Sequence, residues 1–184
     1  MTSSNEQELL SGALSYDLSA LAEIYDRYSP GIYRYAMRLL GNEVQAEECV
    51  ADTFTRFLQA LRIGHGPRDH LQAYLYRIAH NWITDFYRRQ PPPPFPLDDD
   101  LSADPASLPE TLAEEHHLQQ EIRLALRALT PDQRQVIVLR FLEGWDNSEV
   151  AAALKKPVGA IKALQYRGLK LLQTILVKKT REEK

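Results

Sequence analysis

This sequence of 184 residues lacks long apolar runs and has only a single cysteine. The one cysteine, Cys49, cannot form a disulfide within the chain and excludes a zinc site built from several cysteines. No stretch approaches the roughly 20 apolar residues that span a bilayer. The N-terminal sequence MTSSNEQELL lacks the basic start and apolar centre of a signal peptide. We therefore expect a cytoplasmic protein with no membrane segment, in which Cys49 is a packing residue.

A sustained alternation of apolar and polar residues is also missing, so no segment favours a β-strand. Apolar residues instead recur at helical spacing, which predicts an all-α fold. We expect helices over about 43–61, 71–89 and 110–128, and a helix that begins at Pro30. The apolar stripe is clearest in the second of these, where it comprises Leu71, Tyr74, Leu75, Ile78, Ala79, Trp82, Ile83 and Phe86.

Lysine and arginine are absent from residues 91–121, which hold eight acidic residues. Within this stretch, residues 91–110 contain seven of the eleven prolines and four aspartates. Consecutive prolines favour an extended chain and remove backbone donors, so no core forms there. The sequence thus predicts two small helical domains, 1–90 and 111–184, joined by an extended acidic linker over 91–110.

The charge reverses toward the C-terminus, where residues 122–184 carry 13 Lys and Arg against 6 Asp and Glu. Asp146 with Glu149, and Thr130 with Gln133, have the spacing of capping boxes that start helices. A short helix after Asp146, a turn at Lys155 and a longer helix from about Val158 form the helix-turn-helix pattern of DNA-binding proteins. Seven basic and no acidic residues lie between Lys155 and Lys179, which favours contact with DNA phosphates.

Catalytic and metal-binding patterns are missing as well. No nucleophile lies beside a base in a known spacing, and no glycine-rich phosphate loop occurs. His116 and His117 are adjacent on a helix and point in different directions, so they are poor joint metal ligands. We expect no enzyme activity, no cofactor and no bound metal.

Two segments resemble bacterial RNA polymerase sigma factors of the extracytoplasmic function (ECF) group, in the sigma-70 family. AYLYRIAHNWITDFYRR (73–89) is similar to the family's region 2.3–2.4, and residues 129–172 are similar to region 4, including Glu143-Gly144 and Pro157-Val158-Gly159. EVQAEECVADTFTRFLQAL (43–61) is similar to region 2.2. The order of these segments is more specific than a helix-turn-helix alone.

The resemblance implies a specificity subunit that binds core RNA polymerase, through the coiled coil of its largest subunit and its flap, and directs it to promoter DNA. The core-polymerase contacts implied are Glu47, Glu48 and Asp52, with Phe54 supporting their helix from behind. Recognition of the −10 element falls to the loop before residue 71 and to the helix face opposite the apolar stripe. These residues are His65, Arg68, Tyr76, Arg77, His80, Asn81, Thr84, Arg88 and Arg89.

Recognition of the −35 element is implied for the last helix and the turn before it. These residues are Lys155, Lys156, Lys162, Ala163, Tyr166, Arg167 and Lys170. Lys155 stands where the family often has glycine, so we expect a left-handed backbone there. The acidic linker is either a solubilising spacer or a mimic of nucleic acid in the polymerase channel.

Two other functions stay open from the sequence. One is a helix-turn-helix regulator that binds duplex DNA without polymerase, although residues 73–89 would then have no role. The other is an interaction protein that occupies polymerase without initiating transcription. ECF sigma factors are often held by an anti-sigma factor, which the resemblance adds as a candidate partner.

Overall fold

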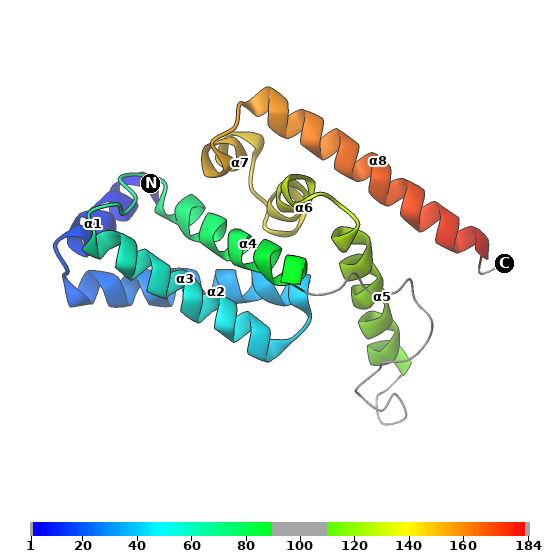
Figure 1. The fold of residues 1–184 in the computed structure, drawn as a ribbon, viewed down its shortest axis with the longest axis horizontal. Coiled ribbons are helices and arrows are strands. Elements are labelled where there is room, and N and C mark those ends of the chain that lie inside the picture. The colour runs from blue at the N-terminus through cyan, green and yellow to red at the C-terminus, as the bar shows by residue number, and fades with distance from the viewer. Residues whose placement is uncertain (1, 90–109, 183–184) are drawn as a thin grey trace.

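The computed structural model describes residues 2–89 and 110–182, and all regular structure in that part of the chain is helical (Figure 1). The expected all-α fold is therefore confirmed. The proposed linker, 91–110, lies almost entirely outside the described residues, so its extended form stays a prediction.

The N-terminal helices are α1 (Thr2–Leu14), α2 (Leu18–Leu40), α3 (Glu43–Arg62) and α4 (Leu71–Arg89). The Asp17 carboxylate caps α2 by accepting from the backbone N–H of Ser19 at 2.8 Å. At its other end α2 stops at Gly41, whose φ of 68° is left-handed. The helix boundaries predicted for α3 and α4 are confirmed within one residue.

Pro30 does not begin a helix, contrary to expectation, because α2 continues through it. Proline cannot donate to the carbonyl four residues earlier, which weakens the helix locally. The apolar stripe of α2 nevertheless runs on both sides of Pro30, with Ile24 and Ile32 fully buried. Burial of this stripe outweighs the missing hydrogen bond, and α2 remains one helix.

The C-terminal helices are α5 (Glu110–Arg127), α6 (Pro131–Ile137), α7 (Asn147–Leu154) and α8 (Val158–Glu182), with a π-helical turn, η2 (Val138–Leu142), after α6. Both predicted capping boxes, at Thr130 and Asp146, are confirmed. Lys155 ends α7 with φ 51° and ψ 42°, which confirms the left-handed turn. The helix-turn-helix is therefore α7, this turn and α8.

The two groups of helices pack against each other (Figure 1). α7 lies on α4, and α5 lies along the end of α2. At Gly41 the approach is so close that an added Cβ would stand 2.7 Å from the Arg123 guanidinium carbon. The sequence predicts two separate modules, and the structure adds a direct contact between them.

Candidate nucleic-acid and polymerase interfaces

The outer face of α8 has the form expected of a DNA-reading helix. Its buried side includes Ile161, and Gly168 lies against Ile137 of α6. On the opposite side Tyr166 is 67 % exposed. All the predicted −35 residues of this helix are exposed: Lys162, Ala163, Tyr166, Arg167 and Lys170.

The turn before α8 adds two lysines of different character. Lys155 is exposed, whereas Lys156 is half-buried and its ammonium lies 3.0 Å from a carboxylate oxygen of Asp132. Asp132 thus balances part of the positive charge of the turn. A phosphate near Lys156 would compete with this carboxylate, while Lys155 faces solvent.

Part of the predicted −10 surface is open to solvent. His65 and Arg68 are exposed on the loop between α3 and α4, where His70 has a left-handed φ of 49°. On α4, Asn81 is exposed, and Arg77 is half-buried with its guanidinium carbon 5.4 Å from the Tyr74 ring centroid.

Arg88 and Arg89 end α4 and are also exposed. A guanidinium nitrogen of Arg88 lies 3.3 Å from a carboxylate oxygen of Asp85. The open part of α4 is therefore the stripe that contains Arg77, Asn81 and Arg88, at helical spacing.

Two predicted −10 residues, Tyr76 and His80, do not face solvent, so the expected orientation is wrong for them. They are 3 % and 4 % exposed, because the C-terminal helices cover this stripe of α4. The Tyr76 ring lies 5.1 Å from that of Trp145, and its hydroxyl donates to Glu143 at 3.2 Å. Tyrosine and histidine side chains are amphipathic, so they occur both on exposed surfaces and in buried interfaces, and the residue type alone does not distinguish the two.

His80 is held inside this contact by both modules. Its Nδ1 is hydrogen-bonded to the Tyr35 hydroxyl at 2.7 Å, and its Nε2 lies 3.3 Å from the hydroxyl of half-buried Thr84. The ring also bonds to the backbone of Pro131, at the start of α6. Burial and then the nearby Arg134 guanidinium lower the pKa of His80 to about 3, so the ring is neutral at pH 7.

Charged residues that the sequence did not single out complete the contact between the modules. Arg38 of α2 donates to the Leu142 carbonyl at 2.8 Å and forms an ion pair with Glu143. The guanidinium carbons of Arg127 and Arg134 lie 4.8 and 4.7 Å from the Tyr87 ring centroid. These residues are far apart in sequence, and no local spacing relates them.

The predicted polymerase-binding side chains lie along α3. Glu47 and Glu48 are exposed, and half-buried Asp52 pairs with Arg56 at 2.5 Å. Phe54 is buried and packs on Tyr25 of α2 with ring centroids 4.8 Å apart. It therefore supports the acidic face from behind, as the sequence predicts.

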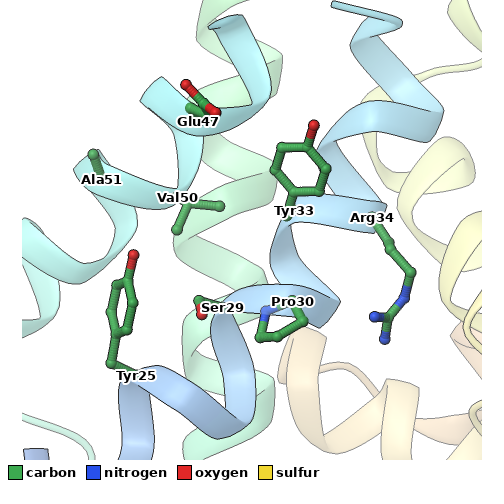
Figure 2. Close-up of a pocket in the computed structure, with 8 residues that line it drawn as sticks. All are labelled: Tyr25, Ser29, Pro30, Tyr33, Arg34, Glu47, Val50 and Ala51. Atoms are coloured by element: carbon green, nitrogen blue, oxygen red, sulfur yellow. The ribbon is translucent and has the colours of Figure 1, made fainter. Parts of the chain in front are cut away.

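A pocket of about 510 Å³ lies beside this acidic face, between α2 and α3. Figure 2 shows Tyr25, Pro30 and Tyr33 of α2 around this pocket, with Glu47 and Val50 on the neighbouring helix α3. The lining is largely apolar and aromatic, and Glu47 and Arg34 add a carboxylate and a guanidinium, which together suit a side chain projecting from a partner helix.

Within the described part of the chain, no helix is long and apolar enough to cross a membrane. Likewise, the described His, Cys, Asp and Glu side chains form no group of three that could hold a metal ion.

Known protein families match both modules. The family profile for sigma-70 region 2 matches residues 24–91, and that for sigma-70 region 4 matches residues 119–172. The ECF RNA polymerase sigma factor BldN of Streptomyces coelicolor is 33% identical over 182 residues, covering 95% of this chain and 67% of that protein. The ECF sigma factor SigX of Bacillus subtilis is 31% identical, covering 82% of this chain and 80% of its own length.

A solved structure shares the fold. CnrH in complex with the cytosolic domain of CnrY has a TM-score of 0.68 at 22% identity, and the match covers 94% of this chain and 97% of that one. The family matches fall on the helices that carry the candidate interfaces, α2 to α4 and α5 to α8. The chain therefore belongs to the ECF group of the sigma-70 family, the factors that direct RNA polymerase to promoters.

Proposed function

We propose that the three candidate interfaces carry the three binding functions of a sigma factor, to core polymerase, to the −10 element and to the −35 element. The face of α3 with Glu47 and the pocket beside it bind core RNA polymerase. The 63–70 loop and α4 hold the −10 element, and α8 reads the −35 element. The observation that carries this proposal is the exposed basic face of α8, the second helix of a helix-turn-helix in which the Asp146 cap of α7 and the left-handed turn at Lys155 are both formed. The subunit itself catalyses no reaction.

Run-off transcription tests the proposal. Purified protein is mixed with bacterial core polymerase and a pool of genomic promoter fragments, with core polymerase alone as the control. New transcripts that require this protein support the initiation role and give the −10 and −35 sequences. Core binding without transcripts would favour the interaction protein, and DNA binding without core would favour the regulator.

The polymerase-binding face has its own test, since Glu47 is exposed and lines the pocket. We expect Glu47→Lys to weaken binding to core polymerase about tenfold, because charge reversal at an interface rim opposes a basic partner. Gln59→Lys, at another exposed position of α3 that does not line the pocket, serves as the matched control. Equal affinity of both variants would remove Glu47 from the interface.

The −10 role requires a change of arrangement, because Tyr76 and His80 lie under the C-terminal helices. We propose that α7 leaves α4 when the factor binds polymerase, which exposes this stripe next to Arg77 and Asn81. The stripe then offers an aromatic ring and hydrogen-bonding groups to an unpaired base.

An anti-sigma factor is the further partner that we propose. The sigma factor RpoE of Bartonella quintana was solved in complex with the anti-sigma factor NepR. Its structure matches this one with a TM-score of 0.53 at 22% identity, and the match covers 81% of this chain and 91% of that one. The partner would be sought by co-purification from the source cell, with loss of run-off transcription on its addition as the supporting result. No inhibition by the recovered protein would count against this role.

A further inference from the structure

Helix α1 is firmly built into the N-terminal module although the sigma-70 region 2 match begins only at residue 24. Leu9, Leu10 and Ala13 are buried against the module. At Gly12 the backbone comes so close to α2 that an added Cβ would stand 2.6 Å from the Cβ of Ala20. The position of α1 is thus fixed by close packing, and the match leaves its role unassigned.

Glu6 of α1 reaches the first residue of α4, which is 65 positions away in the sequence. One carboxylate oxygen accepts from the backbone N–H of Leu71 at 2.8 Å, and the other accepts from the Tyr28 hydroxyl at 3.3 Å. Burial and the Glu6 charge raise the pKa of Tyr28 to about 12, so this hydroxyl stays a donor. Glu6 therefore ties α1, α2 and α4 together at one point.

The start of α4 needs such an acceptor. The first N–H groups of a helix have no partner within it, and a carboxylate there also meets the positive end of the helix dipole. The residue before α4 is His70, which is not a common capping residue and has a left-handed φ of 49°. Glu6 supplies from a distant helix the acceptor that a local cap usually gives.

We infer that Glu6 is a positioning residue, which fixes the 63–70 loop and the first turn of α4 in the form that receives an unpaired −10 base. This inference rests on the proposed function of the loop. Without Glu6 the first turn of α4 would fray. Binding of the base would then have to order this turn, and the entropy cost would weaken the binding. Glu6 touches no DNA in this role and acts through Leu71.

The test compares Glu6→Ala with Glu8→Ala, a change of the same type at an exposed position of α1. Holoenzyme made with each variant is titrated with a single-stranded oligonucleotide carrying the −10 sequence of a promoter that the wild-type protein uses. A lost helix cap typically costs about 1 kcal/mol, so we expect Glu6→Ala to weaken this binding about fivefold. Glu8→Ala should bind like the wild type.

Two further measurements separate positioning from a general loss of folding. Affinity for core polymerase, and for duplex DNA carrying only the −35 element, should not change in Glu6→Ala. Tyr28→Phe, which removes the second hydrogen bond of Glu6, should weaken oligonucleotide binding in the same direction by a smaller factor.

Unchanged oligonucleotide binding by Glu6→Ala, or an equal loss of core affinity, would overturn the inference. Failure of the wild-type holoenzyme to bind the oligonucleotide would instead overturn the proposed function of the loop.

Discussion

The ion pair between Arg38 and Glu143 gives the sharpest test of the contact between the two modules. Glu143 has a side chain that is only 8 % exposed, and it accepts hydrogen bonds from both Arg38 and Tyr76. Arg38→Ala would leave this carboxylate with one of its two partners. The variant should therefore favour an open arrangement in which Glu143 regains water.

The expected size follows from the exposure of each partner. Removing one member of a fully buried pair costs roughly 3–5 kcal/mol, and exposed pairs contribute at most about 1 kcal/mol. Arg38 is 39 % exposed, so we expect the cost of removing it to lie between these two values and closer to that of an exposed pair. We expect about 1.5 kcal/mol, which is about a tenfold rise in the ratio of open to closed molecules.

Single-molecule energy transfer between the modules measures this ratio. Dyes are attached to cysteines introduced at Thr55 on α3 and Gln173 on α8, both exposed positions. Cys49 can remain, because it is fully buried and burial raises the pKa of its thiol to about 12, which leaves it unreactive. Arg62→Ala, an exposed arginine of α3, is the matched control.

A double-mutant cycle with Glu143→Gln shows whether the effect belongs to the pair. If the two residues act together, the double variant will open less than the sum of the single variants predicts. Additive effects, or an Arg38→Ala protein that opens no more than the Arg62→Ala control, would refute the reasoning.

Three more predictions concern single residues. His80 has a pKa of about 3 in the folded protein and 6.5 when free, so below pH 6.5 the unfolded state binds a proton that the folded state does not. The free energy of unfolding should therefore be highest above pH 6.5 and should fall by up to about 2 kcal/mol at pH 5, as measured by urea unfolding. Asp146→Ala removes the cap of α7 and should lower the free energy of unfolding by about 1 kcal/mol in the same assay. Lys170→Ala, at an exposed position of α8, should reduce the salt dependence of holoenzyme binding to a −35 duplex by about one unit of slope, uniformly across sequences.

Each of these has a matched comparison. His80→Gln should flatten the pH dependence between pH 6.5 and 5, whereas His65→Gln, on the exposed loop, should not; identical pH profiles would contradict the burial argument. For Asp146, the exposed Asp69→Ala sets the baseline, and equal stability of the two variants would exclude a capping role. For Lys170, an unchanged salt slope would exclude a phosphate contact, with Arg62→Ala as the reference.

Local features of the fold were predictable because their causes lie within a few residues. The capping boxes at Thr130 and Asp146 satisfy backbone donors three positions away, and the sequence shows both partners. The left-handed turn at Lys155 was expected from the family resemblance, because the family often has glycine at this position. The exposed face of α8 follows from the helical period alone.

The burial of Tyr76 and His80 was not predictable in this way. Helical periodicity separates the two sides of α4, but it does not reveal whether the second side meets water or another module. The partners that cover this side, Glu143 and Trp145, lie more than 60 positions later and beyond the linker. The pocket beside Pro30 was missed for a related reason, since two helices must be placed before a hollow between them exists.

The π-helical turn η2 makes closure of the modules depend on a single residue position. A π turn is an α-helix with one residue inserted, and one residue corresponds to a rotation of roughly 100° about the helix axis. Deleting Phe141, an exposed residue of this turn, would turn Glu143 away from Arg38 and would leave the buried Val138 and Leu139 in the sequence before it. The Asp146 cap, α7 and α8 would still form, because their hydrogen bonds join residues that are close in the sequence. A loss of one in-frame codon could thus abolish closure while leaving the DNA-reading unit intact, so closure and promoter choice are able to evolve separately.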